Sequence, residues 1–104
     1  MGKGYRQGRL GEEIRKIVSE LLLRELKDPG LSSMISVTAV ELTSDGSYAT
    51  VYLSVLSTSG AENEQEEQQK ALDAMNRAKG FIRNEIGRQV KLRHTPELIF
   101  KIDH

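Results

Sequence analysis

Residues 71–90 read ALDAMNRAKGFIRNEIGRQV, and this segment constrains the architecture more than any other part of the 104-residue chain. Its apolar side chains recur about every three or four residues, which is the pattern of one amphipathic helix. Gly80 lies inside this pattern, although glycine costs a helix interior about 1 kcal/mol relative to alanine. We therefore predict a kinked helix from about Glu64 to Val90. Its apolar residues are Ala71, Leu72, Met75, Ala78, Ile82, Ile86 and Val90.

The kink is predicted at Ala78, Lys79 and Gly80, and cations border it. Arg77, Lys79 and Arg83 lie within about one turn of the glycine. A kink gathers such side chains and exposes backbone N–H groups at the start of the second helix, and both attract phosphate. The alternative is that Gly80 only lets another backbone pack closely, which is a common reason for a glycine inside a helix.

Three further elements precede this helix. Apolar spacing predicts an amphipathic helix from about Arg9 to Lys27, which Asp28-Pro29-Gly30 ends. A strand rich in Val, Ile and Thr follows over about 35–43. The dipeptide Asp45-Gly46 is typical of a hairpin turn. Tyr48 to Leu56 then alternates cleanly between apolar and polar residues, as a strand with one buried face does.

A last strand is expected after Pro96, where Leu98, Phe100 and Ile102 alternate with Glu97, Ile99, Lys101 and Asp103. The order is therefore α-β-β-α-kink-α-β, which favours a two-layer α+β fold with helices on one face of a three-stranded sheet. Residues 1–7 are short, glycine-rich and basic, and we expect a flexible arm there. Residues 8–104 form one domain in this interpretation. Phe81 and Phe100 are expected in the core, because phenylalanine is usually buried.

Composition excludes several classes of protein. There is no cysteine, so disulfide and thiol chemistry are absent. The chain shows neither a signal peptide nor an apolar run long enough to span a membrane, and we expect a cytoplasmic protein without membrane contact. His94 lies in a linker without a nucleophile beside it, and the acidic residues near Glu64 lack His or Cys neighbours. We expect no catalytic residue, no metal site and no cofactor.

Charge is segregated along the chain, although the net charge is zero. Residues 1–27 carry a net +3, residues 28–69 a net −7 and residues 70–104 a net +4. The two ends of the chain can therefore form a basic surface while the middle faces elsewhere. Such a surface suits a polyanion. The other interpretation is that each block is simply a solvated face.

The element order, with a glycine between the last two helices, resembles a type II KH domain, and the details resemble the bacterial ribosome-binding factor A family. The likeness covers nearly the whole chain. Its most specific segment is LRHTPELIFKID at 92–103, placed after Ala78-Lys79-Gly80. Further segments are RLGEEI at 9–14, LKDPG at 26–30, ISVTAVEL at 35–42, SDG at 44–46 and ATVYLS at 49–54.

The resemblance implies a non-enzymatic assembly factor. Members of this family bind free 30S subunits or their precursors, contact 16S rRNA, assist late 16S rRNA maturation and are linked to growth in the cold. The chain departs from ordinary KH domains because Ala78-Lys79-Gly80 stands where a GXXG loop would clamp a nucleic-acid backbone. Ordinary KH capture of a single strand is therefore not expected, and the protein is expected to be a monomer.

The chemistry of the chain favours phosphate contacts over base stacking. Only five aromatic residues are present, and Tyr48 and Tyr52 also suit a half-buried sheet surface. We expect Arg and Lys to contact phosphates and sugars. The alternative is a protein adaptor that binds a ribosomal protein instead of RNA, through the acidic middle or the hairpin edge. The candidate RNA-binding residues are Lys3, Arg6, Arg9, Arg77, Lys79, Arg83, Arg88, Lys91 and Arg93.

Overall fold

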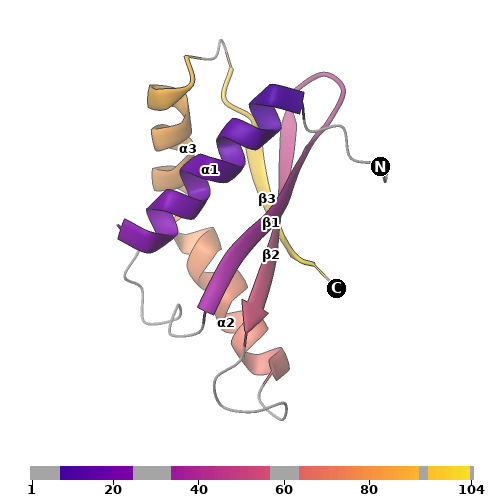
Figure 1. The fold of residues 1–104 in the computed structure, drawn as a ribbon, viewed down its shortest axis with the longest axis vertical. Helices are drawn as coiled ribbons and strands as arrows, with labels where there is room; N and C mark the ends of the chain where they lie inside the picture. The colour runs from indigo at the N-terminus through magenta and orange to yellow at the C-terminus, as the bar shows by residue number, and fades with distance from the viewer. Residues whose placement is uncertain (1–7, 25–33, 57–63, 92–93, 104) are drawn as a thin grey trace.

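Three helices and three strands follow one another in the predicted order (Figure 1). The computed structural model describes residues 8–24, 34–56, 64–91 and 94–103, so the predicted arm at 1–7 lies outside the described residues. The α+β class and the order of the elements are confirmed. The elements are α1 Gly8–Arg24, β1 Met34–Leu42, β2 Tyr48–Leu56, α2 Glu64–Arg77, α3 Lys79–Gln89 and β3 Glu97–Ile102.

The strands form one mixed sheet in the order β1-β2-β3. β1 and β2 are antiparallel, as expected for strands joined by a short hairpin. β2 and β3 are parallel, because α2 and α3 carry the chain back across the sheet before β3 begins. Gly46 takes a positive φ of 76° in the hairpin turn, a conformation that glycine adopts without steric cost.

β1 contains a bulge at Thr38 that the sequence analysis did not predict. Val37 and Ala39 pair with the consecutive residues Leu53 and Tyr52, so Thr38 is the extra residue. The bulge switches which positions of β1 face the helices, and this places four apolar side chains of the strand on the core side. The core-side residues are Ile35 and Val37 before the bulge and Val40 and Leu42 after it.

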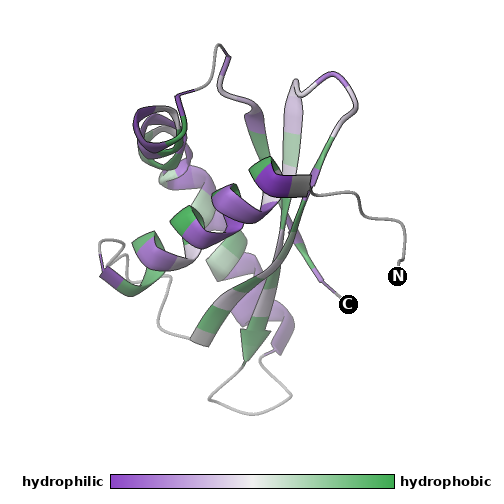
Figure 2. Cartoon of the chain, turned by 45° about the horizontal axis from the view of Figure 1, so that its top comes forward, coloured by the Kyte–Doolittle hydropathy of each residue, from purple (hydrophilic) through white to green (hydrophobic). Residues whose placement is uncertain are grey.

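The helices gather on one side of the sheet, and the core lies between the two layers (Figures 1 and 2). The predicted inward face of β2 is confirmed, because Val51 and Leu53 are fully buried. Each helix contributes to the same cluster. The fully buried helical side chains include Ile14 and Val18 from α1, Met75 from α2 and Ile82 and Ile86 from α3.

The opposite side of the sheet carries no helix among the described residues. It presents the alternate residues of β2 and β3, and we call these the open sheet face. Tyr48 is 48% exposed there and Ile99 is 37% exposed. Tyr52 donates its hydroxyl proton to Glu41 Oε1 at 3.0 Å. The open sheet face consists of Tyr48, Thr50, Tyr52, Ser54, Glu97, Ile99 and Lys101.

The long helix is interrupted at Ala78, the first of the three residues at which we expected the kink. Ala78 has φ −91° and ψ 5°, and helical hydrogen bonds still run from its N–H to Ala74 O (3.1 Å) and from Ile82 N–H to its own carbonyl (2.9 Å). The two halves share β3 but differ in their other partner: α2 also contacts β2, whereas α3 also contacts α1. The change of partner explains why the axis bends between them.

Gly80 lies in the first turn of α3 and has no close neighbour. A Cβ built there meets nothing within 4 Å, so close packing does not explain this glycine. The close-packing interpretation fits Gly87 instead, where a Cβ would lie 2.9 Å from Thr95 Oγ1. The expectation for Phe100 is confirmed, because it is 7% exposed, but the expectation for Phe81 is wrong, because it is 42% exposed.

Candidate nucleic-acid interface

One face of the bent α2–α3 segment carries exposed cations at helical spacing. Arg77 ends α2, and Phe81, Asn84 and Arg88 follow at steps of four, three and four residues. All four side chains are exposed. We call Arg77, Phe81, Asn84 and Arg88 the outer face, because it is turned away from the buried Ile82. The spacing that buries one stripe of α3 therefore necessarily exposes this second stripe.

The one acid of α3 is neutralised by its neighbours. Glu85 Oε2 lies 2.7 Å from Arg88 Nη1, and Glu85 Oε1 accepts a longer hydrogen bond of 3.4 Å from Gln89 Nε2. The side chain of Glu85 is 16% exposed, whereas that of Arg88 is 67% exposed. A guanidinium group has five N–H donors, so Arg88 keeps donors for a further acceptor beside this ion pair.

Arg83 has a structural role that the sequence analysis did not predict. Its guanidinium donates from Nη2 to Thr95 O at 2.7 Å and from Nε to Pro96 O at 3.0 Å. Glu97 Oε2 lies 3.9 Å from its Nη1. These contacts fix the segment that leads into β3. RNA binding by Arg83 stays a prediction, but two edges of its planar group are already occupied by protein oxygens.

The other predicted contact residues are dispersed. Lys79 is half-buried at the start of α3, and Lys91 is exposed just beyond its end. Arg9 is exposed in the first turn of α1, on a different element. Lys3, Arg6 and Arg93 lie outside the described residues. Five of the predicted residues therefore lie on the segment from the end of α2 to just beyond α3, and Arg9 lies on α1. The five are Arg77, Lys79, Arg83, Arg88 and Lys91.

The charge on the middle of α1 is internally paired. Arg15 donates from Nε to Glu12 Oε2 at 3.1 Å and also forms a salt bridge with it through Nη2. The hydrogen bond from Arg15 lowers the pKa of Glu12 below its ordinary value. Because Glu12 and Arg15 neutralise each other, this part of α1 offers less charge to a ligand than its composition suggests.

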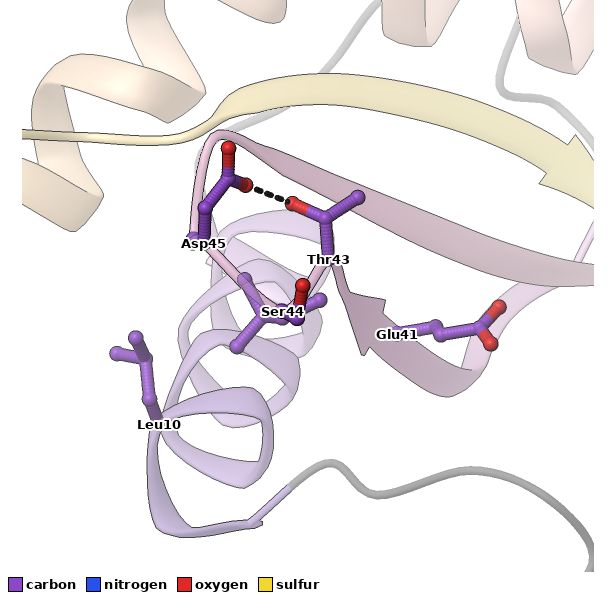
Figure 3. Close-up of a pocket in the computed structure, with 7 residues that line it drawn as sticks. Leu10, Glu41, Thr43, Ser44 and Asp45 are labelled. Atoms are coloured by element: carbon purple, nitrogen blue, oxygen red, sulfur yellow. Dashed lines mark hydrogen bonds between the residues drawn. The ribbon is translucent and has the colours of Figure 1, made fainter.

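An open hollow of about 570 Å³ lies between the start of α1 and the hairpin turn (Figure 3). Asp45 Oδ1 accepts hydrogen bonds there from the Ser47 N–H (3.0 Å) and the Thr43 hydroxyl (2.9 Å). These bonds, with the Ser47 backbone contribution the largest, lower the pKa of Asp45, so the group is a carboxylate at neutral pH. Glu41 adds a second acid to the lining. The Asp45 carboxylate repels phosphate, so this hollow is a poor site for nucleic acid.

No helix in the described parts of the chain has the length and apolar character needed to cross a membrane. The same residues contain no group of three or more His, Cys, Asp or Glu side chains arranged to hold a metal ion. His94 is exposed in the segment before β3.

Comparison with known proteins assigns the chain to one family. The family described as ribosome-binding factor A matches residues 6–104. A relative from Caldanaerobacter subterraneus subsp. tengcongensis, named ribosome-binding factor A, is 45% identical over 100 residues, which are 96% of this chain and 77% of the relative. The match spans every element described above.

Solved structures share the fold. A Thermotoga maritima protein solved by solution NMR matches with a TM-score of 0.78 and 37% identity, covering 100% of this chain and 92% of its own. A homology model of Thermus thermophilus ribosome binding factor A, fitted into a cryo-EM map of its complex with the 30S subunit, also matches, with a TM-score of 0.68 and 29% identity. That match covers 90% of this chain and 91% of the Thermus chain.

Proposed function

This chain belongs to the ribosome-binding factor A family, and we propose that it is an assembly factor that binds the free 30S subunit or its precursor through 16S rRNA. In this proposal it assists late 16S rRNA maturation in the cytoplasm, contributes to growth in the cold, and acts as a monomer without catalysis. The observation that carries the proposal is the similarity to a Thermus protein fitted into a complex with the 30S subunit.

The outer face and its flanking cations would supply the affinity for RNA. Arg77 and Arg88 are exposed near the two ends of α3, with Lys91 just beyond the second end. Basic side chains that neutralise phosphates release counterions, and this term dominates non-specific affinity for nucleic acid. The remaining specificity would come from the shape of the folded rRNA, because the helices and sheet present these cations on a packed core.

Assistance without catalysis is possible because binding shifts populations. A protein that binds one conformation of immature rRNA more tightly than another favours that conformation by the difference in binding free energy. A shift of an equilibrium from 1:99 to 99:1 requires roughly 10⁴-fold preference. Several phosphate contacts made in only one rRNA conformation would provide a preference of that kind.

Co-sedimentation with purified 30S subunits, 50S subunits and 70S ribosomes across a salt series tests the proposal. We expect selective binding to free 30S subunits that weakens steeply as salt rises. Binding to none of the particles, or binding that is indifferent to salt, would contradict it.

The double substitution R77Q/R88Q tests the contribution of the outer face. The slope of log K against log salt is negative, and the loss of two phosphate contacts should make it shallower by about 1.4 to 1.8. The matched control is R24Q/K101Q, which removes two exposed charges from the end of α1 and from the open sheet face. Equal loss of binding in both double variants would remove the outer face from the proposal. A substitution of Arg83 is unsuitable for this test, because Arg83 also donates hydrogen bonds to the carbonyls of Thr95 and Pro96.

A protein adaptor remains the second candidate, and the open sheet face favours it. Tyr48 and Ile99 are partly exposed there, and Leu56 at the end of β2 is 63% exposed. Apolar side chains of this kind mark contact sites for proteins when they gather. Salt-resistant binding that is lost in Y48A and I99A but kept in R77Q/R88Q would favour the adaptor.

A further inference from the structure

Phe81 is the residue of the outer face that phosphate contacts leave unexplained. Its side chain is 42% exposed, whereas Phe100 is 7% exposed. Phenylalanine has no polar group that gains from water, and it is among the residue types most often buried. The buried stripe of α3 passes through the adjacent Ile82, so the core does not need Phe81. Its ring is therefore available to a ligand.

The neighbours of Phe81 on the helix surface are polar or charged. Arg77 lies four residues before it, Asn84 three and Glu85 four residues after it, and Arg88 lies one turn further along the same face. Residues three or four apart on a helix are surface neighbours, with Cβ atoms about 5–6 Å apart. Glu85 is the nearest acid, and its carboxylate is turned to Arg88 and Gln89. The ring thus lies in a cationic setting.

We propose that Phe81 is a stacking platform for an unpaired base of small-subunit RNA, with Arg77 and Arg88 engaging the backbone on either side of that base. The proposal rests on the proposed function and deepens it. Sequence-specific contacts to RNA target unstacked bases, which stack on aromatic side chains. Single-strand sites combine such rings with cations that follow the backbone. The outer face combines both on one helix surface.

Charge complementarity selects RNA over an apolar protein partner for this site. The outer face carries Arg77 and Arg88, and the one acid beside it, Glu85, is paired with Arg88. A phenylalanine that anchors a protein interface is usually surrounded by further contacts that exclude water. Phe81 instead has exposed polar groups on both sides, which match a phosphate backbone that flanks a flat base.

The test compares F81L with F81Y in binding to purified 30S subunits. Leucine keeps an apolar side chain but has no aromatic face, and tyrosine keeps the ring. We expect F81L to bind about fivefold to 150-fold more weakly, in line with the loss of one stacked base. F81Y should stay within about threefold of the original chain. The slope of log K against log salt should not change in either variant, because no phosphate contact is removed.

The matched control is L23A, which removes a large exposed apolar side chain from α1, outside the outer face and the open sheet face. It should bind as the original chain does. Urea unfolding of all three variants shows whether each is folded at the temperature of the assay. Unchanged binding by F81L, or equal weakening in F81L and F81Y, would overturn the stacking proposal while leaving the proposed function intact. Absence of binding by the original chain would overturn both.

Probing of the 16S rRNA in the same complexes with dimethyl sulfate, which modifies A, C and G, and with a carbodiimide, which modifies U and G, separates RNA from protein as the ligand of Phe81. We expect a base whose reactivity changes when the original chain or F81Y is bound, and which keeps its free reactivity with saturating F81L. A loss of affinity in F81L without any such base would assign Phe81 to a protein contact and overturn the proposal.

Discussion

Gly87 lies where Thr95 leaves too little space for a side chain. A Cβ there would lie 2.9 Å from Thr95 Oγ1, closer than packed atoms normally approach, whereas a Cβ at Gly80 would meet nothing within 4 Å. Both glycines lie in α3, where each costs the helix about the same amount of conformational entropy. A comparison of Gly80 with Gly87 therefore distinguishes two effects of glycine on the free energy of unfolding: the conformational cost within the helix and the space left for Thr95.

We predict that G80A and G87A change stability in different directions. G80A should raise the free energy of unfolding by about 0.5–1 kcal/mol, the usual helix preference of alanine over glycine. G87A carries the same gain, but Thr95 must move, and overpacking costs about 1–3 kcal/mol. Urea unfolding measures both values. A G87A variant as stable as G80A would show that Thr95 rotates away freely.

At the scale of elements, Arg83 joins α3 to the segment before β3. Its two hydrogen bonds to the carbonyls of Thr95 and Pro96 fix the chain where it enters the sheet. Gly87 contacts the same segment one turn later along the helix, and Pro96 is fully buried beside it. The position of β3 relative to α3 therefore depends on a few polar and steric contacts as well as on the apolar core.

R83K should be destabilising although the charge is kept. An ammonium group cannot donate to two neighbouring carbonyls with the fixed fork of a guanidinium, and hydrogen bonds to charged groups contribute about 1.5–3 kcal/mol each. Because Arg83 is 36% exposed, we expect a loss near the lower end, about 1–2 kcal/mol in total. R88K is the control, since its exposed ion pair should contribute less than about 1 kcal/mol. Equal urea midpoints for the two variants would contradict this role for Arg83.

The hairpin between β1 and β2 should show a pH-dependent contribution from Asp45. Its folded pKa lies below the ordinary 3.8, because hydrogen bonds from Ser47 and Thr43 favour the carboxylate. The unfolded state therefore takes up its proton first as pH falls, and the stabilisation is complete above the ordinary pKa and lost as pH falls through the folded value.

D45N tests this linkage, because asparagine keeps the turn chemistry and does not titrate. The difference in unfolding free energy between the original chain and D45N should be constant above about pH 5 and shrink below about pH 3.8. Glu12, whose pKa is also lowered, is present in both proteins and cancels from the difference. A difference that stays constant down to pH 2.5 would contradict the assignment.

At the scale of the whole molecule, the sequence predicted what depends on local pattern. The alternation of Tyr48 to Leu56 and the Asp45-Gly46 turn determine the hairpin, and helical periodicity determines α2 and α3. Features that depend on distant partners were missed. Thr38 is a bulge because Val37 and Ala39 pair with consecutive residues of β2. The sequence does contain a sign of this bulge, because the apolar positions change from 35 and 37 to 40 and 42.

The candidate site was predicted less completely than the fold. The cationic segment around the kink was visible in the sequence, but the exposure of Phe81 was not, because helical periodicity alone leaves a residue at the margin of the apolar stripe undecided. The commitment of Arg83 to carbonyl oxygens more than ten residues away also has no local signal. Both depend on how α3 rotates against its partners, which only the packed structure specifies.

The parallel pairing of β2 with β3 also has a consequence for the order of folding during synthesis. The hairpin of β1 and β2 can form early, but β2 gains its second neighbour only after α2, α3 and residues 97–102 have left the ribosomal exit tunnel. Pairings between distant segments form slowly, since the intervening loop must close first. A nascent chain would therefore carry one unprotected edge of its central strand until residues 97–102 emerge, and unpaired strand edges are prone to aggregation.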